Sequence, residues 1–417
     1  MQKILFAALA AAAIALPAQG QQVQSAWVQY APNGAVEARA VVAGDACPAI
    51  AIDGAQSPMR LRAAGDAIFP TVCSAPVPKG AKAVSLDGHA LPVPVADPTR
   101  ILVMGDTGCR IKGKELQACN DPKKWPFPEM AKEEARLKPD LVIDVGDYLY
   151  RENACPAGFA GCTDTPHGDN WPTWDADFFA PAAPLLGAAP WVLVRGNHED
   201  CERAGKGWLR ILGPQAYDPN AACVPHLAPY SVPMGPINLV VMDDANAPDT
   251  SIAADMVPVY RSEIAALANA PTPSWLLMHR PIWGAVSGPL NVPVGGNQTL
   301  IKAIGSTGIP SPVALMLSGH IHTFEAMNYG PHDHVPPQIV AGFGGDKLDP
   351  TPWKLTGTIF QGDSGVNVKD GLSLPGFGFL MMRKVADGWD VDVHNVNGKI
   401  ERRCWFRAGH VGCAKPR

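Results

Sequence analysis

Hydrophobic and polar residues alternate in short runs along the first quarter of the chain. Between residue 21 and about residue 97, runs such as 35–42 and 81–86 are separated by Gly, Pro and Asp. This pattern is typical of a small β-rich domain. The Pro-rich stretch 91–98 is typical of an extended linker. We therefore predict a β-rich domain over residues 21–97 and a second domain over residues 98–417.

Beyond residue 100, uninterrupted apolar runs replace this alternation. Five of them end in glycine or a polar residue, at residues 101–104, 140–145, 191–194, 275–278 and 313–317. Helical patterns are predicted around residues 129–137, 175–186 and 252–268. Strands that alternate with helices predict an α/β sheet, whose site lies outside the carboxyl ends of the strands. We therefore expect the five strand ends to face one crevice. After residue 377 the pattern returns to hairpins, with an Asp-Gly turn at residues 387–388.

Composition narrows the possible partners. The 417 residues suggest two or three domains, or one large domain with an appendage, and 47% of them are apolar. The net charge of −5 argues against nucleic acid as the main partner, because binding of a phosphate backbone needs a basic face. It does not argue against a small anionic substrate, since bound cations dominate a local field.

The first 20 residues are typical of a signal peptide. Lys3 precedes an apolar, Ala-rich run over residues 4–16, and Ala18-Gln19-Gly20 resembles a cleavage site. The alternative is an uncleaved anchor, although the run is short for a transmembrane helix. No later apolar run is long enough to span a bilayer, so we predict an exported protein, periplasmic or secreted.

The ten cysteines support export, because an even number of cysteines in an exported chain suggests disulfides. No C-x2-C pair occurs, which makes a metal-binding role for them weak. Taken in order along the chain, they give five short-range pairs as a hypothesis: Cys47–Cys73, Cys109–Cys119, Cys155–Cys162, Cys201–Cys223 and Cys404–Cys413.

The five strand ends carry the types of side chain that bind metals. They offer two carboxylates, one carboxamide and three imidazoles, which are Asp106, Asp147, Asn197, His279, His320 and His322. A lone Gly-Asp after a strand is more often a turn, and only the full ordered set is a strong signal. Oxygen and imidazole donors together suit zinc or first-row transition metals. Six such groups are too many for one closed tetrahedral site, but they fit two neighbouring metals bridged by a carboxylate.

The order of these motifs resembles the calcineurin-like metallophosphoesterase superfamily. The matching blocks lie at residues 105–108 (GDTG), 146–150 (GDYLY), 196–199 (GNHE), 278–281 (MHRP) and 319–322 (GHIH), and the glycine-rich stretch 342–345 also fits. The resemblance covers about residues 101–345. It implies a four-layer α/β/β/α sandwich, here joined to a small N-terminal β-rich domain.

Two departures from the general pattern resemble the purple acid phosphatase branch. Gly108 stands where most relatives have histidine, and Tyr150 stands where most have aspartate. The resemblance implies that Tyr150 is a phenolate on Fe(III), with Fe, Zn or Mn at the second site. Two Zn or Mn ions, with Tyr150 packed beside them, are the alternative. The implied ligands of the first metal are Asp106, Asp147, Tyr150 and His322. Those of the second are Asp147, Asn197, His279 and His320.

The resemblance implies hydrolysis of phosphate esters by a metal-bound hydroxide. His198 is a candidate for contacting phosphate or protonating the leaving group; orienting the ligand loop is the alternative. The branch commonly has another histidine between its fourth and fifth blocks, and residues 280–319 contain none. Arg280 or Asn297 is the candidate to face substrate there, although Arg280 next to Pro281 is also consistent with a surface charge.

Several alternatives stay open at this point. We favour a phosphomonoesterase, with a phosphodiesterase or nucleotidase as the nearest rival and a non-catalytic phosphate- or metal-binding protein as a different class. The 21–97 domain is either a scaffold or lid, or a binding module. His332-Asp333-His334 suggests either an accessory metal site or a solvated loop, and Trp171 and Trp174 suggest either a pocket wall or core.

Overall fold

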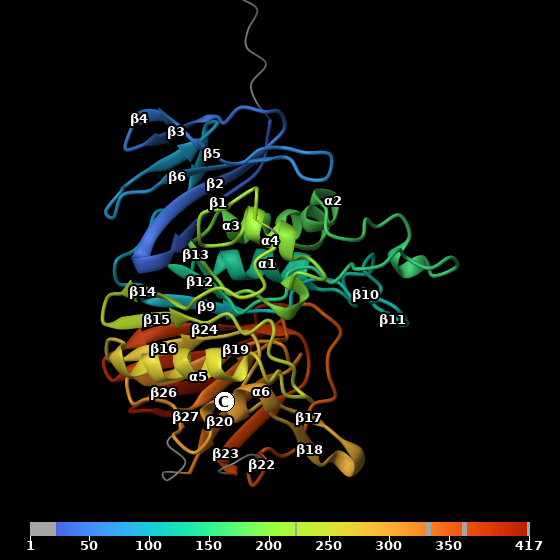
Figure 1. Cartoon of the computed structure of the whole chain (residues 1–417), viewed down its shortest axis with the longest axis vertical. Helices are drawn as coiled ribbons and strands as arrows, with labels where there is room; N and C mark the ends of the chain where they lie inside the picture. The colour runs from blue at the N-terminus through green and yellow to red at the C-terminus, as the bar shows by residue number, and fades with distance from the viewer. Residues whose placement is uncertain (1–21, 222, 331–334, 361–364, 415–417) are drawn as a thin grey trace, which may run out of the picture.

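The computed structural model describes residues 22–221, 223–330, 335–360 and 365–414. The predicted signal peptide and the tract from His332 to His334 lie outside the described residues. Two large sheets, with helices on their outer faces, make up most of the fold (Figure 1). No helix in the described part of the chain is long and apolar enough to cross a membrane.

The first sheet has eleven strands within the described residues. Its order is β27 (His410–Ala414), β26 (Ile400–Arg407), β25 (Gly388–Asn395), β24 (Gly378–Val385), β9 (Arg100–Met104), β12 (Leu141–Asp144), β13 (Trp191–Leu193), β1 (Val23–Ala31), β2 (Ala35–Val42), β6 (Thr71–Pro76) and β5 (Arg60–Ala63). Strands β9, β12 and β13 are parallel, and β24 runs antiparallel to β9.

The second sheet has eight strands in the same described ranges. Its order is β14 (Tyr230–Met234), β15 (Ile237–Val241), β16 (Ser274–Leu277), β19 (Val313–Ser318), β21 (Gln338–Ala341), β20 (Phe324–Tyr329), β23 (Val366–Leu374) and β22 (Ile359–Phe360). Smaller sheets hold β3 (Ala49–Ile52), β4 (Ala55–Pro58), β7 (Val84–Leu86) and β8 (His89–Leu91), the pair β10 (Ile111–Lys112) and β11 (Glu115–Leu116), and the hairpin β17 (Ala285–Ser287) and β18 (Pro293–Gly295).

Alternation along the strands divides the core into three layers. In β9, Ile101 and Val103 point between the sheets, whereas Leu102 and Met104 point outward. The outward face of the first sheet packs on α1 (Phe127–Arg136), α2 (Trp171–Trp174), α3 (Ala180–Leu186) and α4 (Gly205–Ile211). The outward face of the second packs on α5 (Val257–Ala266) and α6 (Gln298–Ile304). The predicted four-layer α/β/β/α architecture is therefore confirmed.

Most predicted elements are present, with two local differences. The helix predicted from residue 252 begins only at Val257, because turns occupy the preceding residues and Pro258 sits in its first turn. The helix predicted over residues 175–186 begins as the π-helical turn Asp175–Phe179. Trp171 and Trp174 both belong to the hydrophobic core beneath this segment.

The five disulfides join the ten cysteines as predicted from their order: Cys47–Cys73, Cys109–Cys119, Cys155–Cys162, Cys201–Cys223 and Cys404–Cys413. Each bridge closes a short loop, of between 7 and 26 residues in sequence separation. They therefore brace local units rather than link distant ones.

The N-terminal strands extend the first sheet. Gln29 of β1 pairs with Trp191 of β13, so the sheet continues from the strands beyond residue 100 into residues 23–76. Two arginines from these strands also reach the end of α4. Arg39 donates to the carbonyls of Ile211 and Gly213, and Arg62 donates to four carbonyls between residues 209 and 215.

These arginines satisfy carbonyl groups that the end of a helix leaves without partners. Helix α4 follows directly after the loop that carries Asn197 and His198. The contacts favour a scaffold role for the N-terminal region. The division of the chain at residue 97 stays a prediction.

A buried glutamate on α1 lowers the stability of the fold above acidic pH. Glu134 is fully buried, and neither of its carboxylate oxygens has a hydrogen-bond partner among the described residues. Burial raises its pKa from 4.5 to about 8. The unfolded chain therefore loses this proton at lower pH than the folded chain does. Stability falls as the pH rises from about 4.5 to about 8 and then levels off.

We expect Glu134→Gln to be more stable than the native chain at pH 7, by on the order of 1–3 kcal/mol. The difference should shrink toward zero near pH 4.5. Urea unfolding at pH 5 and pH 7 measures it. Glu133→Gln, at a partly exposed neighbouring position, is the control and should change stability little. A Glu134→Gln effect that is equal at both pH values would contradict this account.

Candidate metal centre

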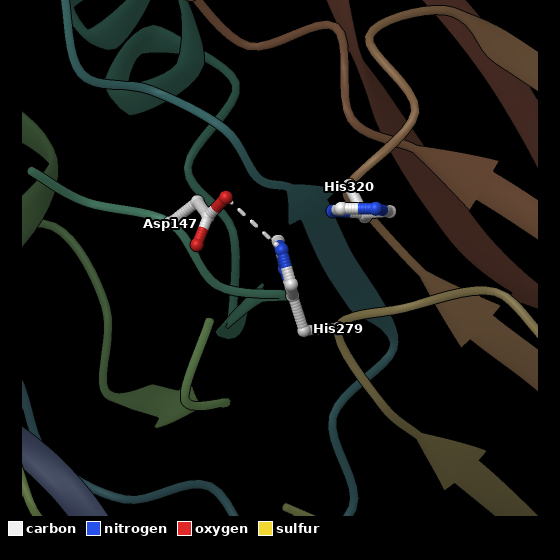
Figure 2. A group of neighbouring side chains, drawn as sticks. All are labelled: Asp147, His279 and His320. Atoms are coloured by element: carbon white, nitrogen blue, oxygen red, sulfur yellow. Dashed lines mark ion pairs between the residues drawn. The ribbon is translucent and has the colours of Figure 1, made fainter. Parts of the chain in front are cut away.

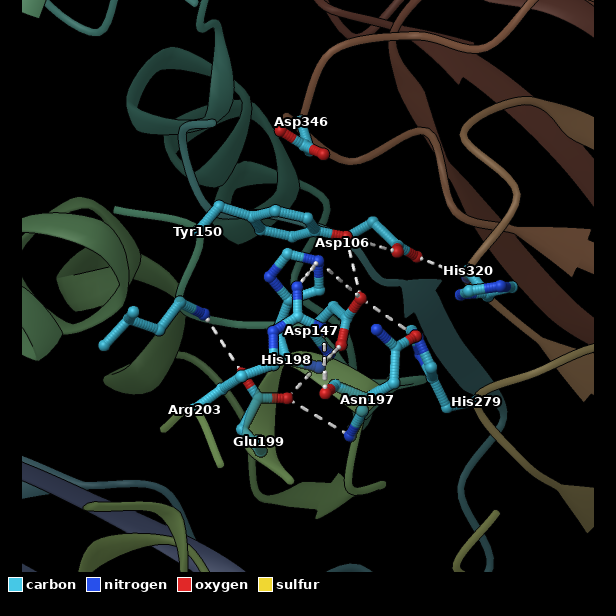
Figure 3. A network of polar contacts seen from close by, with 12 residues as sticks. Asp106, Asp147, Tyr150, Asn197, His198, Glu199, Arg203, His279, His320 and Asp346 are labelled. Carbon is cyan, nitrogen blue, oxygen red and sulfur yellow. Dashed lines mark hydrogen bonds and ion pairs between the residues drawn. The ribbon is translucent and has the colours of Figure 1, made fainter. Parts of the chain in front are cut away.

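The predicted ligands follow strands from both large sheets. Asp106, Asp147 and Asn197 come after β9, β12 and β13 of the first sheet. His279 and His320 come after β16 and β19 of the second sheet. The side chains converge in one cluster (Figure 3). The five strand ends thus meet as expected, but the site lies at the junction of two sheets.

The backbone at three of these residues is held in the left-handed region. Asp106, Asp147 and His320 have φ angles of 58°, 63° and 68°. This conformation is uncommon outside glycine, although Asn, Asp and His adopt it more readily than other residues, and it collects at functional sites. Hydrogen bonds fix it here: the Asp106 N–H donates to the carbonyl of Gly146, and the His320 N–H donates to Oδ2 of Asp106.

Tyr150 lies at the centre of the first group of donors. Its Oη is 2.9 Å from Oδ1 of Asp106, 2.8 Å from Oδ2 of Asp147 and 3.0 Å from Nε2 of His322. All four side chains are buried. Gly108 explains how the phenol fits, because a Cβ at this position would lie 2.9 Å from Cδ2 of Tyr150 and 2.7 Å from the Tyr148 carbonyl. A side chain at position 108 and the Tyr150 ring would compete for one space.

His279 lies at the centre of the second group. Its Nε2 is 3.1 Å from Oδ1 of Asn197 and 3.1 Å from Oδ2 of Asp147. Donor atoms of Asp147, His279 and His320 all lie within 4.8 Å of one another (Figure 2). Asp147 therefore belongs to both groups, as the bridging role predicted for it requires.

Each of the three histidines has one ring nitrogen held by an acceptor outside the cluster. Nδ1 of His279 is 2.8 Å from the Val145 carbonyl, and Nδ1 of His322 is 2.7 Å from the Lys347 carbonyl. In His320 the outside contact is made by Nε2 instead of Nδ1. The contact that fixes its orientation joins Nε2 of His320 to Oδ2 of Asp249 at 2.7 Å.

Such partners fix the tautomer of a metal-binding histidine and leave its other nitrogen with a free electron pair. This arrangement offers Nε2 of His279, Nε2 of His322 and Nδ1 of His320 as ligand atoms. The donor set combines carboxylate, phenol, amide and imidazole groups. It therefore fits two transition-metal ions.

The buried acidic groups give the site a strongly negative potential. Burial and the neighbouring Asp106 and Asp147 raise the pKa of Tyr150 well above its usual value. Burial alone would lower the pKa of His279 and His322, but the surrounding carboxylates raise it to about 9 and about 10. A potential that holds protons on two buried imidazoles also favours metal cations at the same place.

His198 lies beside both groups of donors. Its backbone N–H donates to Oδ1 of Asp147, and its ring lies 3.8 Å from the Tyr150 ring between centroids. Nε2 of His198 is 2.8 Å from Nη2 of Arg203. Nδ1 is 2.7 Å from Oε1 of Glu152, although the angle of this contact is too poor for a hydrogen bond. Burial lowers the pKa of His198 to about 4, so the ring is neutral near pH 7.

Glu199 ties two of the ligand loops together. Its carboxylate accepts from the backbone N–H groups of Asp147, Tyr148, Leu149 and Gly196, at 2.9–3.1 Å. The fourth residue of the GNHE block therefore acts on the backbone. It holds the Asp147 loop against the loop that carries Asn197.

Arg280 and Asn297, the two other residues predicted to face substrate, have different surroundings in the structure. The guanidinium of Arg280 contacts Oδ2 of Asp249 and lies 3.1 Å from Nε2 of His320. Asn297 is buried, and its amide group caps α6 through Leu300 while donating to Ala247 and Asp249. All of its hydrogen-bonding groups are thus engaged in structure.

Several residues of the site were missed by sequence reasoning. Asp249 and Glu152 lie in loops, with no strand end or motif to mark them. Asp177 accepts hydrogen bonds from the Tyr150 and Cys109 backbone and sits in the π-helical turn. Asp244 accepts from the His279 and Arg280 backbone. Only Asp244 stands where the sequence gives a signal, because Asp243 and Asp244 directly follow the apolar run 237–242.

Fold and site together define a two-sheet α/β protein with a cluster of metal-type ligands at the junction of its sheets. The calcineurin-like phosphoesterase family model matches residues 99–324, which is more than half of the chain. The chain belongs to this family, and the predicted superfamily is confirmed. It is accordingly a metal-dependent phosphoesterase with a two-metal site.

Solved structures show the same fold at low sequence identity. A purple acid phosphatase, PPD1, from yellow lupin (Lupinus luteus) seeds is similar at a TM-score of 0.55 and 13% identity, covering 90% of this chain and 72% of that one. PhoD is similar at a TM-score of 0.55 and 11% identity, covering 94% of this chain and 92% of that one. The comparison with curated proteins gave no match.

Asp249 generates the first test of the site. We expect Asp249→Asn to weaken metal binding at the second group about 10–100-fold, because His320 loses the carboxylate that orients it. Titration calorimetry with Zn²⁺ on metal-free protein measures this loss. Asp255→Asn, an exposed neighbour in sequence, is the matched control and should bind like the native chain. Equal affinity in all three proteins would remove Asp249 from the site.

Proposed function

We propose that this chain is an exported, purple acid phosphatase-like enzyme that hydrolyses phosphate monoesters. In this proposal the first metal is held by Asp106, Asp147, Tyr150 and His322. The second metal is held by Asp147, Asn197, His279 and His320. The five disulfides support export, because such bridges persist in oxidising compartments.

One observation carries the proposal: the phenol of Tyr150 lies within 3.0 Å of three other proposed ligands. A packed aromatic residue would not need its hydroxyl among two carboxylates and an imidazole. Gly108 leaves the space that the phenol ring occupies. Gly108 and Tyr150, the two residues that differ from the general family pattern, therefore belong to one local arrangement.

The same arrangement favours Fe(III) at the first site. A free phenol ionises near pH ~10, and burial among carboxylates raises the pKa of Tyr150 further. Only a strong Lewis acid would hold it as a phenolate at neutral pH. Fe(III) is stronger in this respect than Zn(II) or Mn(II). The second ion is Fe, Zn or Mn.

Bound metal ions of this kind neutralise phosphate oxygens and acidify a bound water. The chain supplies the positioning. His198, anchored through its backbone to Asp147, contacts the phosphate or, at acidic pH where its ring is protonated, passes a proton to the leaving group. Arg280 is placed to approach the phosphate from the His320 side, if it leaves its contact with Asp249. Guanidinium groups suit phosphate through paired hydrogen bonds.

Assays with 4-nitrophenyl phosphate and bis(4-nitrophenyl) phosphate test the function. We expect a higher kcat/KM for the monoester in the metal-loaded mature protein. Asp147→Ala should lose at least 10³-fold in kcat/KM, because it removes a ligand shared by both metals. A preference for the diester would instead assign the chain to phosphodiesterases. Hydrolysis of neither ester would overturn the proposal.

The visible spectrum of the oxidised protein tests the metal assignment. We expect a charge-transfer band from tyrosinate to iron that Tyr150→Phe abolishes. Tyr148→Phe is the control, because its hydroxyl donates to the Val194 carbonyl outside the cluster. A colourless, metal-loaded protein would assign Zn or Mn to both sites and make Tyr150 a neighbour of the metals.

A further inference from the structure

A large cavity opens beside the second group of donors. It has a volume of about 510 Å³, and His320 and Asp249 form the side that faces the metal centre. The apolar part of its lining is formed by Pro281, Gly284, Val286, Val294 and Ile321, and Thr250, Asn297 and Gln298 also line it. Because His320 belongs both to the cavity and to the proposed ligands, a group leaving the phosphorus on this side would enter the cavity.

The charged residues that line the cavity are acidic. Asp249 and Asp349 line it, and none of its lining residues among those described is lysine or arginine. Asp349 is fixed, because it accepts a hydrogen bond from the His322 backbone. A second phosphate group of a substrate would meet the carboxylate of Asp349 here, because Asp249 is already paired with Arg280, which is not among the lining residues. Nucleoside di- and triphosphates therefore fit this cavity poorly.

The outer wall continues the apolar surface toward solvent. Strands β17 and β18 form a hairpin that projects from the body of the protein (Figure 1). The hairpin carries Leu290, Val292 and Val294, which are 98%, 55% and 46% exposed. The Ser287 N–H donates to the Pro350 carbonyl, which holds the hairpin against the loop that follows Asp349. An apolar group longer than the cavity would thus stay in contact with apolar side chains.

We propose that this cavity binds the alcohol part of the substrate and selects phosphate esters of uncharged, apolar alcohols. This inference rests on the proposed function and names its substrate class. Val286 and Val294 are the specificity-determining residues, since they face each other across the hairpin and both line the cavity. Apolar burial supplies the selectivity, and the carboxylate of Asp349 disfavours polyphosphates.

Rates with a series of esters test this inference. The substrates are ethyl and hexyl esters of the class, monoester or diester, that the chromogenic assay favours, together with adenosine triphosphate. We expect kcat/KM for the hexyl ester to exceed that for the ethyl ester at least tenfold, because each buried methylene contributes roughly fourfold. Adenosine triphosphate should be the poorest substrate. Equal rates for the two esters, or a preference for the triphosphate, would overturn the inference.

Two variants, one in the cavity wall and one outside it, test whether the cavity causes the chain-length preference. Val294→Asp should lower the hexyl-to-ethyl ratio of kcat/KM at least fivefold, because it places a charge in the cavity wall. Leu61→Asp makes the same kind of change at an exposed apolar residue of β5, away from the cavity and its hairpin, and should keep the native ratio. If both variants keep the ratio, the cavity is not the site of selection. Failure to hydrolyse any ester would count against the proposed function, whereas hydrolysis without chain-length preference would count only against this inference.

Discussion

The rest of the site depends on the buried carboxylate of Asp147 and on the contacts that it makes. It lies 2.8 Å from the phenol of Tyr150 and 3.1 Å from the imidazole of His279, and the His198 backbone donates to its other oxygen. It is fully buried, so its charge must be balanced locally. The two proposed metal ions would provide that balance. Around it, several backbone hydrogen bonds hold the end of β12 in its left-handed conformation.

Two sheets are needed to surround this carboxylate. The first sheet contributes the oxygen-rich ligands Asp106, Asp147 and Asn197, and the second contributes His279 and His320. Residues outside the ligand set keep the two halves in register. Glu199 joins the loops of the first sheet, and Asp244 holds the His279 backbone in the second. The apolar core between the sheets fixes the distance between the halves.

Substrate selection has a different physical basis from metal binding. The metal centre is buried and negative, and in the proposed function its two cations attract phosphate. The adjoining cavity is mostly apolar and bounded by Asp249 and Asp349. A substrate is therefore chosen, in our proposal, by the part of the ester that the metals do not touch. Asp249 links the two regions, because it contacts both His320 and Arg280.

Much of this protein was determined by its sequence alone. The ordered strand-end motifs predicted the family, the four layers and a set of seven side chains that the structure brings together. The order of the cysteines predicted all five disulfides, because each pair is close along the chain. Local patterns of this kind are readable because strand alternation and glycine-bounded loops need only near neighbours.

Tertiary structure decided what depends on residues far apart in sequence. Asp249 meets His320 across 71 positions, and Arg39 meets the end of α4 across more than 170. Gly108 is explained by the Tyr148 carbonyl, the Asp177 carboxylate and the Tyr150 ring, which together fill the space beside it. The apolar cavity likewise forms only when the β17–β18 hairpin folds against the loop at Asp349. No local pattern marks such contacts, because packing between separate elements, rather than the preference of any one segment, creates them.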